Sequence, residues 1–153
     1  MKKIDSPLNY ALYLLELRDR SIFEVRNKLK LKEFPENEIE ETIQFLIQKK
    51  FLDDEKFAKN MVRSKSLSGE GKQKIKVRLI KAHISSGLIE DVLSNIDSDL
   101  EYKNALEIGQ KILDRNKDTD RGRLYQKILG SLYRKGYDFD LAKKVFNELV
   151  SSD

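Results

Sequence analysis

The chain has 153 residues, of which 39% are apolar and 37% charged, and its formal net charge is +4. Regular apolar periodicity excludes intrinsic disorder, while the high polarity favours an elongated array with thin cores over a single compact globule. The absence of cysteine excludes a disulfide framework and a thiolate metal site. No apolar run is long enough to span a membrane, and Met1–Lys3 precede no such run, so we expect a soluble, cytoplasmic protein.

The first 52 residues predict three helices joined by short connections. Ser6 is expected to cap the first helix, with Pro7 at the first helical position. Ser21 and Glu24 have the spacing of a capping box, in which each side chain accepts a hydrogen bond from the other residue's backbone amide. The second helix ends before Pro35, and the third runs from Glu36 to about Lys50.

A second triplet begins at Asp53, which is expected to cap a helix that ends at about Ser66. Helix capping accounts for Asp53 and for the neighbouring Asp54, because no histidine or further carboxylate lies at metal-ligand spacing. Residues 67–71 break the chain, and the following helix is expected to turn three apolar side chains inward: Ile75, Leu79 and Ile80.

The three-helix unit recurs along the chain. Tyr10-Ala11, Phe57-Ala58 and Asn104-Ala105 are separated by 47 residues each. Steps of five, five and four residues connect matched apolar positions in three places: Leu29, Phe34, Ile39 and Ile43; Leu79, Ile84, Ile89 and Leu93; Leu132, Tyr137, Ala142 and Phe146. We therefore expect an all-α fold of three tandem three-helix repeats in an elongated, curved body, with repeats at 7–52, 53–97 and 98–150.

Positive charge concentrates in the second repeat. Between Lys56 and His83 there are nine basic residues and one acidic residue, Glu70, so this segment carries about +8 and the remainder is net acidic. A solvated surface is the simpler interpretation, but this imbalance favours an anionic partner. The candidate contacts are Lys59, Arg63, Lys72, Lys74, Lys76, Arg78 and Lys81.

Among these candidates, Arg63 and Arg78 are expected to make the most specific contacts, because the planar guanidinium can hold a phosphate or carboxylate with two hydrogen bonds. Basic residues outside the segment are expected to contribute much less: Lys2, Lys3, Lys143 and Lys144.

Nothing in the sequence indicates catalysis. Cysteine is absent, His83 is the only histidine, and no glycine-rich phosphate loop is present, so we expect neither an enzyme nor a bound cofactor or metal. His83 is expected to be structural or exposed, and Gly136 to end a helix in the left-handed conformation. Four aromatic residues at helical spacing are expected in the core rather than stacked on bases: Tyr10, Tyr13, Phe23 and Tyr125.

Two segments resemble the bacterial regulatory protein RecX family. One is Arg18-Asp-Arg-Ser21-x-x-Glu24 followed by Leu29, and the other, more specific, is Leu52-Asp53-Asp54-x-x-Phe57-Ala58, with Leu79 and Ile84 after it. The resemblance extends over about residues 8 to 148. The family often has glycine where this chain has Glu33 and Phe51, so the geometry of those two turns is expected to differ.

The resemblance implies an elongated all-helical monomer that binds the RecA recombinase filament on single-stranded DNA, with weak direct binding to DNA. Such a protein lies along the filament groove and lowers ATP hydrolysis, strand exchange and co-protease activity. It thereby regulates DNA repair, homologous recombination and the SOS response. Two alternatives from the residues alone stay open: a stand-alone DNA-binding protein of helix-turn-helix type, and a helical-repeat scaffold that binds proteins.

Overall fold

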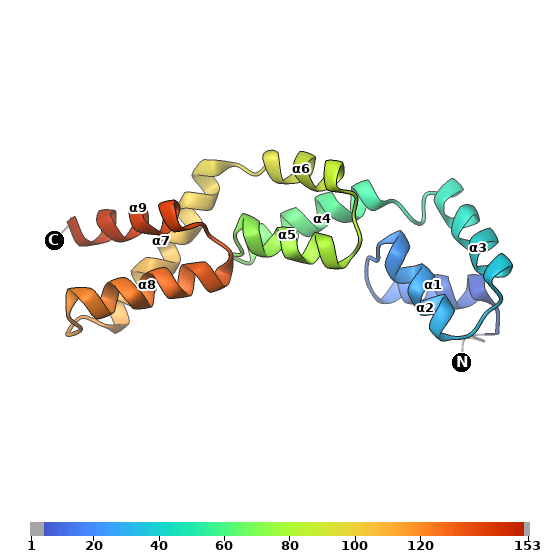
Figure 1. Cartoon of the computed structure of the whole chain (residues 1–153), viewed down its shortest axis with the longest axis horizontal. Coiled ribbons are helices and arrows are strands. Elements are labelled where there is room, and N and C mark those ends of the chain that lie inside the picture. Colours follow the sequence, from blue (N-terminus) through green and yellow to red (C-terminus); the bar gives the residue numbers. More distant parts are fainter. Residues whose placement is uncertain (1–4, 152–153) are drawn as a thin grey trace.

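The structure is a computed structural model that describes residues 5–151, so Lys2 and Lys3 lie outside the described residues. Within that range the regular secondary structure is entirely α-helical, as predicted, and the helices form an elongated arch (Figure 1). In chain order they are α1 (Pro7–Leu17), α2 (Ile22–Leu31), α3 (Glu36–Gln48), α4 (Asp54–Leu67), α5 (Lys72–Lys81), α6 (Ser86–Ser94), α7 (Ser98–Arg115), α8 (Arg121–Lys135) and α9 (Phe139–Ser151).

Three separate cores hold the helices in groups of three. The first core gathers buried residues between Ala11 and Leu52, the second between Phe57 and Val92, and the third between Ala105 and Leu149. All extensive helix–helix packing joins helices of the same triplet. The predicted architecture of three three-helix repeats in an elongated, curved body is therefore confirmed, with thin cores in series.

Most of the predicted helix ends are confirmed. Ser6 accepts from the amide of Asn9, Asp53 accepts from the amide of Lys56, and Ser21 with Glu24 forms a complete capping box. The prediction for Ile80 is wrong, because its side chain is 53% exposed. Ile75 and Leu79 define the buried face of α5. Ile80 follows Leu79 directly, so its side chain lies about 100° further around the helix axis and faces solvent.

The second helix of each repeat ends in the same way. Glu33, His83 and Gly136 follow α2, α5 and α8 and adopt positive φ angles of 63°, 56° and 100°. The next amide then donates to the carbonyl five residues back: Phe34 to Leu29, Ile84 to Leu79 and Tyr137 to Leu132. This left-handed helix ending explains the five-residue step that recurs in the sequence.

The same geometry bears on the two positions where the family often has glycine. Glu33 adopts the left-handed conformation that glycine would adopt without strain. In the turn after α3 the positive φ, 62°, falls on Lys50, and the neighbouring Phe51 donates its amide to the carbonyl of Leu46. The turn after α2 thus has the backbone conformation that glycine favours, although the residue there is Glu33.

Backbone groups connect the second and third repeats. The amide of Gly71, which precedes α5, donates to the carbonyl of Lys135 at 2.8 Å, and the amide of Gln73 donates to that of Gly136 at 3.0 Å. The hydroxyl of Tyr137 donates to the carbonyl of Gly69 at 2.6 Å, and burial raises the pKa of this tyrosine to about 12. The carbonyl end of α8 therefore caps the amide end of α5, where each helix lacks partners of its own.

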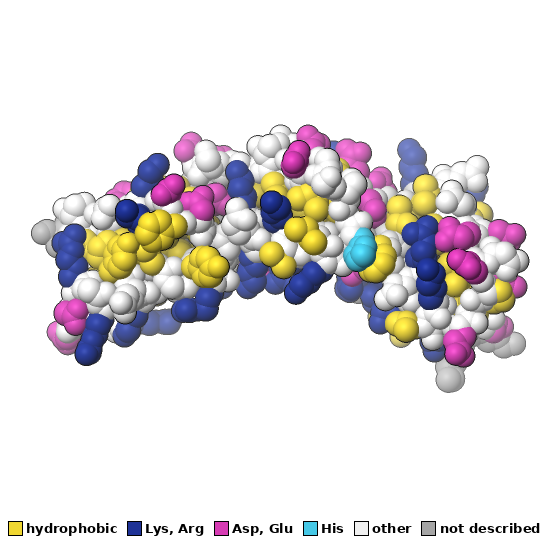
Figure 2. Space-filling view, in the orientation of Figure 1, with side chains coloured by type: hydrophobic (Ala, Val, Ile, Leu, Met, Phe, Trp, Pro, Cys, Tyr) yellow, Lys and Arg dark blue, Asp and Glu magenta, His cyan; other side chains and the backbone are white. Residues whose placement is uncertain are grey.

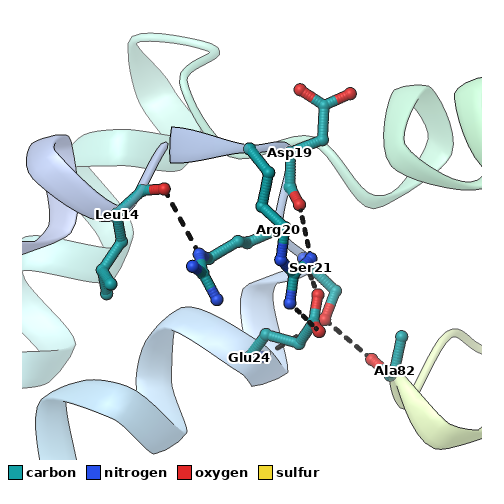
Figure 3. A network of polar contacts seen from close by, with 7 residues as sticks. Leu14, Asp19, Arg20, Ser21, Glu24 and Ala82 are labelled. Carbon is teal, nitrogen blue, oxygen red and sulfur yellow. Dashed lines mark hydrogen bonds and ion pairs between the residues drawn. The ribbon is translucent and has the colours of Figure 1, made fainter. Parts of the chain in front are cut away.

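Side chains connect the first and second repeats (Figure 3). The buried hydroxyl of Ser21 donates to the carbonyl of Ala82, at the end of α5, at 2.8 Å. The amide of Ile22 donates to the carboxylate of Asp54 at 2.9 Å, and the rings of Phe23 and His83 stack with centroids 3.5 Å apart. Asp54 was predicted to cap its own helix; it instead accepts at the start of α2, in the preceding repeat.

We predict that Ser21→Ala destabilises the protein by about 2–3 kcal/mol, because it removes both the cap of α2 and the donor for the buried carbonyl of Ala82. Ser6→Ala is the matched control, since Ser6 caps α1 without a contact to another repeat, and it is expected to cost about 1 kcal/mol. Chemical denaturation measures both. Equal losses would contradict the role assigned to the bond between repeats.

We also predict that Gly71→Ala costs about 1–3 kcal/mol, because the added methyl carbon would lie 2.6 Å from the carbonyl carbon and oxygen of Gly136. Gly87 in α6 has nothing within 4 Å of such a carbon. Gly87→Ala should therefore leave the stability unchanged or raise it by up to about 1 kcal/mol. A similar effect of the two substitutions on the free energy of unfolding would show that the close approach of the repeats is not required.

Candidate nucleic-acid and partner interface

The second helix of each repeat is net positive. Helices α5 and α8 each contain five basic residues and no acidic residue, and α2 contains three basic residues and one acidic residue. The third helices of the first two repeats have the opposite sign, since α3 contains four glutamates and α6 one glutamate and one aspartate, with no basic residue in either. Charge is therefore sorted by position within the repeat.

The contacts between repeats place these basic helices in a row. Helix α8 abuts the start of α5, and α5 ends against the start of α2, so the three follow one another along the concave lower edge of the arch (Figure 1). Figure 2 shows Lys and Arg side chains gathered along this edge below α5 and α8, with acidic side chains over α6 on the upper edge and around α3 at the right-hand end. We call the basic residues of α5 and α8 the basic row: Lys72, Lys74, Lys76, Arg78, Lys81, Arg121, Arg123, Lys127, Arg134 and Lys135.

Within the basic row, Arg78 and Lys74 share one carboxylate. Arg78 donates two hydrogen bonds to Glu70, at 2.8 and 2.6 Å, and the Nζ of Lys74 lies 3.7 Å from the same side chain. The hydrogen bonds from Arg78 hold the pKa of the Glu70 carboxyl below its usual value. The guanidinium of Arg78, which was expected to hold a phosphate or carboxylate of the partner with two hydrogen bonds, instead holds Glu70 in the connection between α4 and α5.

Three lysines of the basic row are better placed for an external partner. Among residues 5–151, the side chains of Lys72, Lys76 and Lys81 form no ion pair, and Lys76 and Lys81 are exposed. The backbone amide of Lys72 donates to Glu101 at 3.0 Å, which holds the first turn of α5 against α7. These ammonium groups can therefore move toward an anion while the helix beneath them stays fixed.

Two of the predicted contacts lie on another helix. Lys59 and Arg63 are one turn apart on α4, and Lys59 pairs with Glu55 at 2.7 Å. Glu55 raises the pKa of this lysine, with smaller contributions from Asp91 and Asp53. Lys59 thus has acidic surroundings, while Arg63 is exposed and forms no ion pair within the described part of the chain. The structure brings five of the seven predicted residues together and leaves these two apart.

The sequence-based prediction missed the basic residues of α8. A count of charge along one continuous stretch does not include them, because the basic residues recur at equivalent positions of separate repeats. Comparing α5 with the helix at the same place in the third repeat would have revealed them. Lys143 was expected to contribute much less than the basic segment, and this stays a prediction; its Nζ lies over the ring of Phe139, 5.2 Å from the centroid.

Of the four aromatic residues expected in the core, Tyr10 and Tyr125 pack against one, whereas Tyr13 and Phe23 are half-buried and belong to none of the three cores. Tyr10 stacks on Tyr13 with centroids 6.4 Å apart, and Tyr125 meets Phe146 edge to face at 5.0 Å. Phe23 stacks on His83, and this contact helps to join two repeats. The histidine is nevertheless exposed to solvent. Two strongly exposed aromatic residues were not identified from the sequence, Tyr133 and Phe139.

The described residues contain no group of three or more histidine or acidic side chains that could hold a metal ion. Within the same residues, no helix combines the length and apolarity that crossing a membrane requires.

Comparison with known proteins gives three consecutive family matches. The model of the first three-helix domain of RecX matches residues 8–46, that of the second matches residues 53–93, and that of the third matches residues 99–146. Regulatory protein RecX of Clostridioides difficile (strain 630) is 36% identical over 146 residues, covering 95% of this chain and 68% of that protein. Regulatory protein RecX of Clostridium perfringens (strain 13 / Type A) is 33% identical over 147 residues, covering 95% and 69%.

Solved structures agree with these matches. The crystal structure of RecX from Lactobacillus salivarius superposes with a TM-score of 0.84 at 28% identity, and the match covers 94% of each chain. A second crystal structure of a regulatory protein RecX gives a TM-score of 0.80 at 22% identity, covering 96% of this chain and 72% of the other, which supports the fold.

The Glu70–Arg78 pair predicts a pH-dependent contribution to stability. Because the folded-state pKa of Glu70 is lowered, the pair stabilises the fold above the unfolded-state pKa, and this contribution is lost as pH falls through the folded-state value. Denaturation of the wild type and Glu70→Gln at about pH 7 and about pH 3 should show a stability difference that shrinks in acid. A difference that stays constant or grows on acidification would contradict the assignment.

Proposed function

The chain belongs to the RecX family of regulatory proteins, and from this membership we propose that it binds a RecA recombinase filament assembled on single-stranded DNA. In this proposal the arch lies along the filament groove with its basic row facing the DNA-bearing side. Occupation of the groove lowers ATP hydrolysis, strand exchange and co-protease activity without any chemistry by the chain itself. The continuity of the basic row across two repeats is the observation that carries the proposal.

The length of the basic row suits an extended polyanion. Ten residues of α5 and fifteen of α8 placed end to end span roughly 38 Å at 1.5 Å per residue. Lysines without an ion pair supply mobile point charges along this length, and a charged surface of one sign accelerates association with an anionic partner. The acidic opposite edge would disfavour binding in the reverse orientation.

The repeat boundaries belong to the same proposal. We propose that residues 7–52, 53–97 and 98–150 form the three units that contact the filament side by side. The three buried clusters support this division, since each draws its members from one of these ranges. Three modest contacts held in one body bind more tightly than any of them would alone.

The stand-alone helix-turn-helix alternative has less support. Such proteins insert the N-terminal part of a recognition helix into the major groove. The N-terminus of α5 is covered by α8, and that of α2 is held against the end of α5. Helices α3 and α6 carry acidic residues and no basic ones, so they would be repelled by phosphates.

The test measures how far the chain inhibits RecA ATP hydrolysis on single-stranded DNA over a range of salt concentrations. Lys76→Ala, Lys81→Ala and the double variant each remove exposed charge from the basic row. Removal of one ammonium group that binds a phosphate should weaken inhibition and flatten the slope of log affinity against log salt by about 0.7. Lys111→Ala, an exposed lysine of α7, is the control and should leave the slope unchanged. If Lys111→Ala changes inhibition and its salt dependence as much as the double variant does, the basic row is only a solvated surface and the proposal is contradicted.

A further inference from the structure

An open groove with exposed aromatic walls lies within the basic row, where α5 meets α8 and α9. It has a volume of about 600 Å³, and its lining includes Lys74 and Val77 of α5, Tyr133 and Arg134 of α8, and Phe139 of α9. We call it the junction groove. The exposed fractions of Tyr133, Phe139 and Val77 are 77%, 59% and 49%. In Figure 2, hydrophobic side chains reach the surface near this junction, directly above the Lys and Arg side chains of the lower edge.

The floor of the junction groove is rigid. The amide of Gln73 donates to Gly136, and a methyl carbon at Gly136 would lie 2.5 Å from the Cβ of Lys74. Asp138 also lines the groove, but its carboxylate accepts from the amide of Leu141 and caps α9. The rings of Tyr133 and Phe139 are therefore presented on helix ends whose separation the backbone fixes.

The charge around the junction groove selects an anionic occupant. Lys74 lines it from α5 and Arg134 from α8, and the Nζ of Lys143 lies 5.2 Å from the centroid of Phe139. Flat exposed rings between cations are the arrangement that proteins use for single-stranded nucleic acid, in which bases stack on rings and phosphates meet Lys and Arg. A strand that follows the basic row from α5 to α8 must cross this groove, which favours nucleic acid over an acidic peptide.

We propose that the junction groove binds unpaired bases of single-stranded DNA. Tyr133 and Phe139 provide the stacking faces, while Lys74 and Arg134 hold the flanking phosphates. The biological setting of this site rests on the proposed function, because the filament supplies the strand, but binding to a bare strand is measurable without the filament. The site would give the chain a preference for unpaired over duplex DNA that charge alone cannot provide.

The absence of tryptophan from the chain allows a direct test. In Tyr133→Trp the new indole is the only tryptophan, and titration with an oligothymidylate of about 12 nucleotides should quench its fluorescence through stacking. An abasic strand of equal length retains the phosphates and should bind at least about fivefold more weakly with little quenching. Equal binding of the abasic strand, or equal quenching by poly-glutamate, would overturn the proposal in favour of a phosphate-only or a peptide site respectively.

A second series needs no reporter. Tyr133→Leu should weaken binding of the same oligothymidylate at least about fivefold, whereas Tyr133→Phe, which keeps the ring, should bind like the wild type. Phe45→Leu is the matched control, because Phe45 is also exposed but lies on the acidic helix α3. Wild-type affinity in Tyr133→Leu would overturn the proposal. Inhibition of RecA measured in parallel separates the two ideas, since a failure of the basic-row variants to alter inhibition would count against the proposed function alone.

Discussion

The architecture depends on hydrogen bonds that helix ends cannot make within their own helices. An α-helix leaves its first amides and last carbonyls without partners, and here a neighbouring repeat supplies several of them. The end of α8 accepts from Gly71 and Gln73 at the start of α5, and the carbonyl of Ala82 after α5 accepts from Ser21 at the start of α2. Because the repeats share little other packing, these bonds set the direction in which successive repeats continue, and they align the second helices.

The two segments that carry the family resemblance serve this joining. In the first, Arg18 pairs with Glu24, and Arg20 donates to the carbonyl of Leu14, which holds Ser21 against the next repeat. In the second, Leu52 is buried in the first core, and Asp54 reaches back to the start of α2. The residues that identify the family therefore join the first and second repeats, whereas five of the seven candidate partner contacts lie on α5, which this contact places next to α2.

Sequence reasoning was most successful where a local rule fixes the outcome. Caps such as Ser21 with Glu24, and the five-residue step at the end of each second helix, follow from backbone groups close in the chain. It failed for Ile80, because adjacent apolar residues leave the orientation of a helix ambiguous by about 100°. The bond from Ser21 to Ala82 joins residues 61 positions apart, and no local pattern encodes it. The basic residues of α8 follow from the sequence only when equivalent helices of the repeats are compared, and the exposure of the Tyr133 ring follows only from the structure.

We propose that the concave edge formed by α5 and α8 is the surface that meets the partner. An electron cryomicroscopy reconstruction of the chain bound to a RecA filament on single-stranded DNA tests this claim most directly. We expect α5 and α8 to face the DNA-bearing groove, with α3 and α6 directed toward solvent. A reconstruction in which the acidic edge of α3 and α6 faces the groove, while the basic row points outward, would contradict the account.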